Sequence, residues 1–124
     1  KTVEEVLRFD PPLHLFMRWC HTPTTILGHR FEPGDPVALL LGAANRDPAV
    51  YAEPHIFDPT RAPGPVSSFG AGIHFCLGHA LARLELQIAL EVLWERCQNL
   101  RQVAPARYAD SYHFHGLDRL VVAR

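Results

Sequence analysis

The most regular apolar pattern in the chain lies at 79–97 and predicts its longest helix. Apolar side chains recur there every three or four residues in two stripes on nearly opposite sides. Arg83, Gln87 and Glu91 form the only clear polar ribbon. A helix that is apolar on two faces is typical of one that other elements cover on both sides. We therefore expect a long buried helix, and a chain of 124 residues holds little material to cover it.

Shorter patterns on either side of this helix predict a mixed α/β (α+β) fold in a single domain, 1–124. Val37–Leu41 is a continuous apolar run, which favours a strand buried on both faces. Turns are expected at Gly28-His29 and at His115-Gly116. In chain order we expect a helix at 1–9, strands within 13–41, a short helix at 42–51, a proline-rich meander at 52–68, a cysteine loop at 69–78, the long helix at 79–97 and C-terminal strands at 98–124.

Composition and charge exclude some classes of binding partner but say little about the fold. The chain is 48% hydrophobic and 20% charged, and its formal net charge is -1, which argues against nucleic acid or an anionic membrane as a partner recognised through bulk charge. No apolar run approaches the roughly 20 residues that a membrane span requires. Three widely spaced cysteines indicate no disulfide framework, so we expect a reducing cytoplasm. The chain begins at Lys1 inside a helical pattern, from which we expect a fragment or a processed product.

The candidate chemistry centres on Cys76, which lies among Gly70, Gly72 and Gly78 immediately before the long helix. Glycines allow a tight backbone wrap, and unpaired N–H groups at a helix N-terminus favour the thiolate over the thiol. The thiolate is the form that attacks an electrophile or binds a metal. The pattern alone leaves open whether this cysteine is a nucleophile or a ligand.

Four interpretations of Cys76 compete. A nucleophile on a strand-to-helix elbow lacks the first glycine of that motif and a convincing Asp-His partner set. A zinc site with His74, His79 and either His113 or His115 lacks the paired ligand spacing of structural zinc. A buried structural cysteine leaves the surrounding glycines unexplained. The fourth is a single axial thiolate to haem iron.

A resemblance to a known family favours the haem ligand. Residues 69–83, FGAGIHFCLGHALAR, resemble the haem-binding motif of the cytochrome P450 superfamily in its bacterial soluble form, through Phe69-x-x-Gly72-x-His74-x-Cys76-x-Gly78 and then Leu81-Ala82-Arg83. Glu5-x-x-Arg8 resembles the family's E-x-x-R helix, and residues 44–48 and 57–61 resemble the segments that lead to the cysteine loop.

This resemblance implies the C-terminal fragment of the mainly helical haem-thiolate monooxygenase fold, with haem b as cofactor and Cys76 as the axial and catalytic ligand. A thiolate ligand pushes electron density onto the iron and favours O–O cleavage. The N–H groups of Leu77 and Gly78 are implied to temper the thiolate charge, and Arg18 and His74 to bind the propionates. The implied haem-binding residues are Phe69, Gly70, Gly72, His74, Cys76, Leu77, Gly78, Ala82 and Arg18.

The resemblance also changes the interpretation of Glu5 and Arg8. Their spacing places them on one helix face, where an exposed ion pair contributes only about 0–1 kcal/mol. The family implies instead a buried network with Arg61. A buried pair tolerates burial only when it is fully paired, so replacing either residue should cost folding and haem retention.

Two functions from different classes follow from the resemblance. The first is the haem-thiolate part of a monooxygenase that oxidises a small apolar organic substrate with electrons from a ferredoxin-type donor. The second is a truncated, catalytically incompetent chain that binds haem weakly or not at all and forms a homodimer, or binds a complementing chain, through its uncovered apolar face. The family's central proton-delivery helix is expected upstream of Lys1. The implied substrate contacts are Leu13, His14, Leu15, Phe16, His113 and Phe114.

Overall fold

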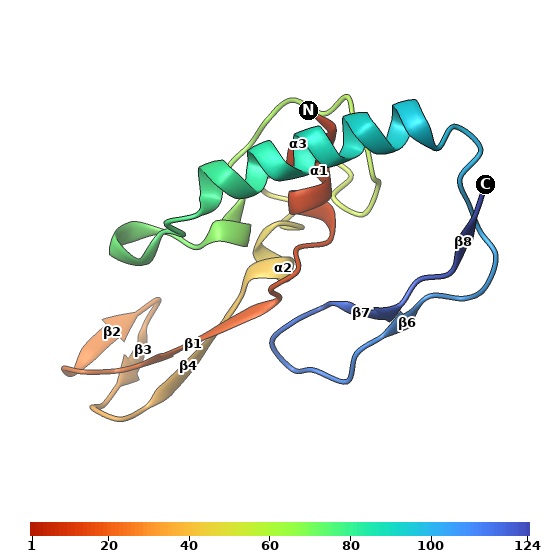
Figure 1. Ribbon diagram of the computed structural model, residues 1–124. Helices are drawn as coiled ribbons and strands as arrows, with labels where there is room; N and C mark the ends of the chain where they lie inside the picture. The colour runs from red at the N-terminus through yellow and green to blue at the C-terminus, as the bar shows by residue number, and fades with distance from the viewer.

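The computed structural model describes residues 1–124 as one long helix, two short helices and several two-stranded antiparallel ribbons, which confirms the mixed α/β fold (Figure 1). The helices are α1 (Thr2–Phe9), α2 (Leu41–Ala44) and α3 (His79–Arg96), with the 3-10 turns η1 (Ser67–Phe69) and η2 (Gly72–His74). The strands are β1 (Leu15–Trp19), β2 (Thr24–Ile26), β3 (His29–Phe31), β4 (Pro36–Leu40), β5 (Arg101–Gln102), β6 (Arg107–Tyr108), β7 (Leu117–Arg119) and β8 (Val122–Ala123). The pairs are β1–β4, β2–β3, β5–β8 and β6–β7.

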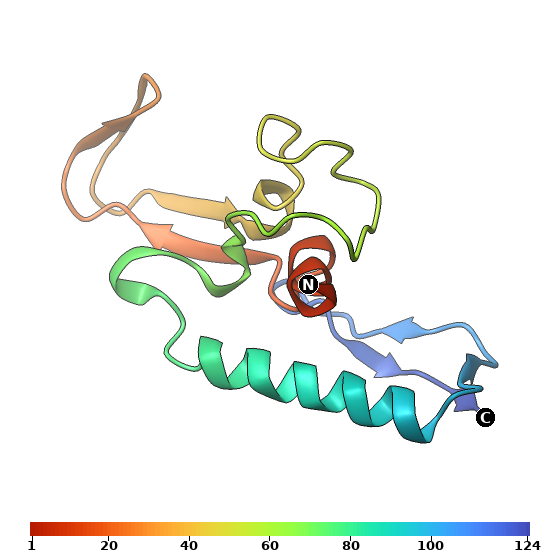
Figure 2. The same cartoon turned by 90° about the horizontal axis from the view of Figure 1, so that it is seen from above.

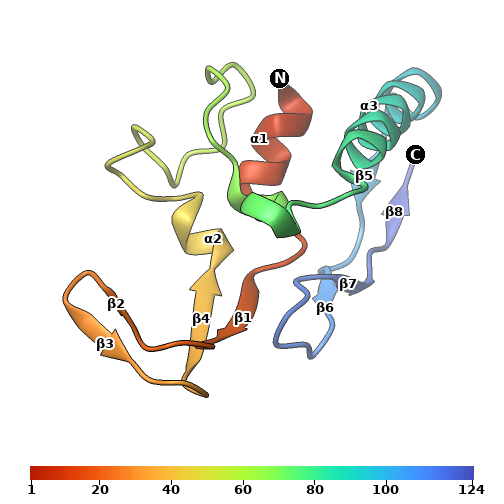
Figure 3. The ribbon, with the colours of Figure 1, turned by 90° about the vertical axis from the view of Figure 1, so that its left-hand side faces the viewer.

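The elements are arranged around α1. Figure 2 shows α1 end-on between α3 on one side and the meander on the other. The β1–β4 ribbon, with β2–β3 at its tip, extends away from the helices, and the C-terminal ribbons lie on the opposite side of α1 (Figure 3). The two ribbons meet only where the chain leaves α1, through an isolated antiparallel bridge between Leu13 and Phe114.

The buried core is small and largely polar. Only nine residues are buried, and they lie where α1, α2, η1 and the meander meet. Leu7, Leu41 and Tyr51 supply the apolar part. The buried polar and charged residues are Glu5, Arg8, Asn45 and Ser68. Residues 52–66 contain no helix or strand, so side-chain hydrogen bonds from this core must hold the meander in place.

The long helix forms as predicted, but the expectation that it is buried is wrong within this chain. No residue of α3 is buried, and Leu81 and Ile88 are 59% and 51% exposed. The side of α3 nearest α1 carries the polar ribbon, because Arg83 pairs with Glu4 of α1 at 2.7 Å. The stripe that contains Leu81 and Ile88 is therefore largely exposed, whereas Ala82 and Leu86 of the second stripe are half-buried. Residues 1–124 fully cover no residue of either stripe.

Two details of the N-terminal ribbons also differ from expectation. The run Val37–Leu41 is not covered on both faces, since Leu40 in β4 is 59% exposed and a two-stranded ribbon has no second layer. The hairpin turns at Leu27 and Gly28, whose φ angles are 49° and 81°, and not at Gly28-His29. His29 instead pairs with Ile26, which leaves two residues in the left-handed conformation that tight hairpins prefer.

Elsewhere the predicted elements are shorter or wider. The helix expected at 42–51 is one turn, α2, and turns follow it as far as the meander. The C-terminal turn expected at His115-Gly116 is a broad loop that joins β6 to β7. None of the helices combines the length and apolar character needed to cross a membrane.

Candidate functional site: a cysteine loop beside a buried ion-pair network

Glu5 and Arg8 form a two-pronged ion pair inside the core. The Arg8 Nη2 and Nε atoms donate to the two Glu5 carboxylate oxygens at 2.7 and 2.8 Å. Both side chains are 2% exposed, so this is not the solvated surface pair that the spacing alone suggests. Paired parallel N–H···O bonds are the strongest arrangement available to these groups. The pair thus resembles a structural anchor more than a surface contact.

The same pair orders the meander. Arg8 Nη1 donates to the carbonyls of Asn45 and Pro54 at 3.0 and 2.9 Å, and Arg8 Nη2 donates to Ile56 at 3.2 Å. The backbone N–H of Asp58 donates to Glu5 at 2.9 Å. One ion pair on α1 therefore satisfies backbone groups on segments 37 to 53 residues away.

Arg61 completes the network that the family resemblance implies. Its Nε atom lies 3.4 Å from a Glu5 carboxylate oxygen. Its guanidinium also donates to the carbonyls of Ala52 and Glu53 at 2.6 and 3.2 Å. The structure brings Glu5, Arg8 and Arg61 together, with Glu5 shared between two cations.

These contacts fix the charge of Glu5. The hydrogen bonds from Arg8 lower the pKa of Glu5 from 4.5 to about 2, against the opposing effect of burial. The Asp58 amide and the Arg61 charge lower the pKa further. The pairing with Glu5 in turn raises the pKa of Arg8. Both groups are therefore charged throughout the physiological pH range, which favours a structural role over proton transfer.

Sequence reasoning missed a second buried group that ties the network to the cysteine loop. Asn45 is fully buried, and its amide nitrogen donates to the Ser68 hydroxyl at 2.8 Å while its amide oxygen accepts from the Ser67 N–H at 2.7 Å. The Ser68 hydroxyl donates to the carbonyl of Leu7. Asn45 thus joins the end of α2 to η1, directly before the loop. The sequence signal was indirect: Asn45 lies within the helix predicted at 42–51 and within residues 44–48, which resemble a family segment.

The cysteine loop is a backbone wrap closed by one hydrogen bond. The N–H of Cys76 donates to the carbonyl of Phe69 at 2.9 Å. Gly70 and Gly72 have φ angles of +71° and +67°, which non-glycine residues rarely adopt. The N–H groups of Leu77 and Gly78 donate to no group of the chain. Two free donors follow the half-buried sulfur, an arrangement that suits a thiolate.

Phe69 is fixed from the α3 side. The Arg83 guanidinium lies 4.5 Å from the centre of the Phe69 ring, and the same arginine pairs with Glu4. The rings of Phe75 and His79 approach Phe69 edge-on at 6.4 and 6.2 Å. The start of α3 and the cysteine loop are therefore held in one arrangement by aromatic and cation–π contacts.

Several of the predicted haem-binding residues share one hollow between β1 and the cysteine loop. Its volume is about 500 Å³, and Phe16, Arg18, Gly70, Gly72 and His74 are among the residues that line it. The lining contains no acidic side chain, and Arg18 makes no ion pair. Gly70 lets the loop approach β1 closely, since a Cβ there would lie 3.4 Å from the Phe16 ring. A Cβ at Gly72 would meet nothing within 4 Å.

These residues fit a haem group. A thiol beside free N–H donors suits the iron ligand, and an arginine and a histidine in an acid-free hollow suit two propionates. Cys76, Leu77, Gly78 and Ala82 lie along the loop and the first turn of α3, outside the lining of the hollow.

The predicted substrate contacts are divided between two places. Phe16 lines the hollow beside the cysteine loop. Leu13 and Phe114 pair across the isolated bridge, and Leu15 begins β1. His14 points toward Asp10, whose carboxylate oxygen lies 3.4 Å away, and His113 is exposed.

Comparison with known proteins agrees with this geometry. The family model for cytochrome P450 matches residues 1–105. The biotin biosynthesis cytochrome P450 of Bacillus subtilis is 44% identical over 121 residues, which are 97% of this chain and 31% of that protein.

Solved structures give the same result. P450BioI in complex with an acyl carrier protein ligated to hexadec-9Z-enoic acid has a TM-score of 0.92 and 44% identity over 96% of this chain and 31% of that one. CYP164A2 of Mycobacterium smegmatis with econazole bound has a TM-score of 0.93 and 40% identity over 98% of this chain and 30% of that one. The chain thus spans about a third of the length of these relatives. The chain belongs to the cytochrome P450 family, whose members are haem-dependent oxidoreductases.

Proposed function

We propose that this chain supplies the proximal haem half-site of a bacterial monooxygenase, with Cys76 as the thiolate ligand of haem b. The observation that carries the proposal is the closed cysteine loop: Cys76 is tied to Phe69 at 2.9 Å and is followed by two N–H groups that the chain leaves free. Bound haem supplies dioxygen activation, and a thiolate ligand supports that chemistry.

The chain's own residues bind and orient this group. The N–H groups of Leu77 and Gly78 donate hydrogen bonds to the Cys76 thiolate and so reduce the negative charge on its sulfur. Arg18 and His74, both on the hollow, receive the propionates. Phe69 covers the cysteine side, and Glu5, Arg8 and Arg61 keep the meander, and through it the loop, in position.

The remaining parts of the proposal rest on family membership. Electrons come from a ferredoxin-type donor in the cytoplasm, where the three unpaired thiols stay reduced. The substrate is a small apolar organic molecule, in keeping with the apolar side chains of Phe16 and Leu39 on the hollow.

The test is the absorbance spectrum of the haem-loaded chain after reduction and addition of CO. We expect the red-shifted Soret band of a thiolate complex, and its loss in Cys76→Ala. Cys20→Ala and Cys97→Ala remove the other two thiols and should leave the band unchanged, which makes them matched controls. A band that survives in Cys76→Ala, or a chain that takes up no haem, would overturn the proposal.

A second candidate is favoured by the exposure of α3. Trp94 is 82% exposed and Leu84 54%, and no residue of α3 is buried. In this alternative the chain is catalytically incompetent and pairs with a second copy through α3. Sedimentation equilibrium separates the two: a dimer that Trp94→Glu dissociates, in a preparation without haem, supports the alternative. A haem-loaded monomer excludes it.

A further inference from the structure

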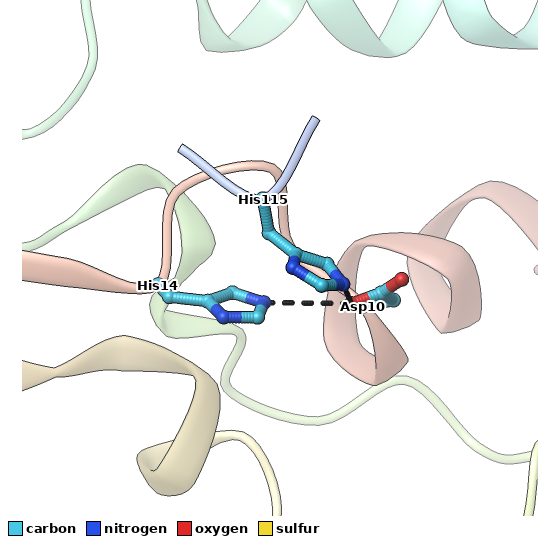
Figure 4. Close-up of side chains that lie close together, drawn as sticks. All are labelled: Asp10, His14 and His115. Carbon is cyan, nitrogen blue, oxygen red and sulfur yellow. Dashed lines mark ion pairs between the residues drawn. The ribbon is translucent and has the colours of Figure 1, made fainter. Parts of the chain in front are cut away.

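Away from the cysteine loop, three side chains with metal-binding atoms converge at the end of α1 (Figure 4). Asp10 follows α1, His14 precedes β1, and His115 lies in the loop between β6 and β7. Their ligand atoms all lie within 4.8 Å of one another. His14 Nε2 and His115 Nε2 lie 3.4 and 3.5 Å from the same Asp10 oxygen, Oδ1. None of the three side chains makes a hydrogen bond elsewhere, so all three are free to act together.

The backbone on both sides of the cluster is already fixed. The N–H of His115 donates to the carbonyl of Pro12 at 2.9 Å, and the N–H of His14 donates to the carbonyl of His113 at 3.1 Å. The two imidazole rings stack at 4.3 Å with an angle of 19° between their planes. The Tyr108 ring stacks on His115 at 4.1 Å. The histidines are therefore held together by contacts that need no metal.

The distances match the ligand spacing of a tetrahedral divalent site. Metal–ligand bonds of about 2.0–2.2 Å place neighbouring ligand atoms about 3.3–3.5 Å apart. Both Asp10–histidine separations have this value. The remaining edge, between the two histidine nitrogens, closes by rotation of side chains that are between a third and a half exposed.

The local charge also suits a cation. Two neutral imidazoles and one carboxylate are nitrogen and oxygen ligands that Zn²⁺ accepts, with water in the fourth position. The nearby cation, Arg46, is directed elsewhere: its guanidinium donates to the carbonyl of Phe9 at 2.6 Å and lies over the Phe9 ring at 4.3 Å. We propose that Asp10, His14 and His115 bind one divalent transition-metal ion such as Zn²⁺.

Such an ion joins two segments that are far apart in the sequence. It fastens the loop between β6 and β7 to the segment between α1 and β1, beside the Leu13–Phe114 bridge. The ion therefore adds a cross-link to the hydrogen bonds and ring contacts that already hold this loop beside the segment before β1. The site is distinct from the haem half-site, because Cys76 and the cysteine loop contribute no ligand to it.

The test measures binding of Zn²⁺ alone to the purified, tag-free full chain by calorimetry, with Co²⁺ as a spectroscopic substitute. We expect one ion per chain, and visible Co²⁺ bands without the charge-transfer band of a thiolate ligand. Asp10→Asn, His14→Gln and His115→Gln should each weaken binding by at least about tenfold, since loss of even an outer partner of a metal ligand costs about 10–100-fold. His113→Gln, on the same loop but outside the cluster, is the matched control and should bind as the parent chain does.

A second measurement uses the unaltered chain. Zn²⁺ should protect His14 and His115, among eight histidines, from acylation by diethyl pyrocarbonate, as read by mass spectrometry. Absence of stoichiometric Zn²⁺ binding overturns the proposal. Equal protection of all histidines, binding that the three variants leave unchanged, or a thiolate band in the Co²⁺ spectrum does so as well.

Discussion

Replacing Glu5 by glutamine removes one negative charge from the core and leaves the Arg8 guanidinium buried without its partner. The shape of the side chain is kept, so the change tests the charge and little else. Arg8 is 1% exposed and cannot turn to water. Breaking a buried pair from one side costs about 3–5 kcal/mol.

The pKa of Glu5 gives an independent value for the free energy that its ion pair contributes to folding. Its fall from 4.5 to about 2 means that folding favours the charged form by about 3 kcal/mol, each tenfold change in the acid constant being about 1.4 kcal/mol. Because the pKa is lowered on folding, this stabilisation is fully present above pH 4.5 and is lost as the pH falls toward 2. Glutamine does not titrate, so in Glu5→Gln this position contributes no pH dependence to the free energy of unfolding.

Urea unfolding followed by circular dichroism measures both effects. At pH 7 we expect Glu5→Gln to lower the free energy of unfolding by about 3–5 kcal/mol, and the difference from the parent chain to shrink as the pH falls from 4.5 toward 2. Glu4→Gln is the matched control: Glu4 adjoins Glu5, pairs with Arg83 and is 30% exposed, so its loss should cost about 0–1 kcal/mol. Equal losses for the two variants, or a Glu5→Gln difference that does not vary with pH, would refute the reasoning.

Four further substitutions test other parts of the site. Asn45→Ala removes three side-chain hydrogen bonds of a fully buried residue and should lower the free energy of unfolding by about 2–4 kcal/mol, measured by the same urea titration. Gly70→Ala and Gly72→Ala both place an L-residue at a positive φ, at about 1–3 kcal/mol, but Gly70, with φ 71° and ψ -159°, lies in a region that essentially only glycine occupies, and its added Cβ would contact the Phe16 ring of β1, so Gly70→Ala should reduce haem uptake more; equal uptake contradicts this. Tyr51→Phe removes the hydrogen bond from the phenol to the Pro65 carbonyl and should cost about 1 kcal/mol in thermal unfolding.

The sequence predicted the local parts of the fold best. The helix at the N-terminus, the length of α3 and the absence of regular structure in the meander all follow from spacing and proline content. The errors arose where burial was inferred from apolar pattern alone. The run in β4 and the stripes of α3 are apolar enough to be buried, yet residues 1–124 leave most of their large apolar side chains exposed.

The candidate site was predictable only where a motif encodes it. The spacing of Glu5 and Arg8 places both on one face of α1, but it does not reveal which distant carbonyls Arg8 will bind. Asp10 and His115 come from opposite ends of the chain, and only the fold brings them together. The roles of Cys76 and its neighbours toward haem remain predictions.

The meander between Ala52 and Val66 is held in place by α1. The buried ion pair of α1 makes hydrogen bonds to two carbonyls and one amide of the meander. How readily a protease cleaves the meander therefore reports whether α1, about 50 residues earlier in the chain, is in place. A protease cuts extended, unpaired backbone far more readily than a segment held in place. Limited proteolysis should nick this segment first whenever α1 is loosened, and the cut would separate α1 from the cysteine loop that it helps to position.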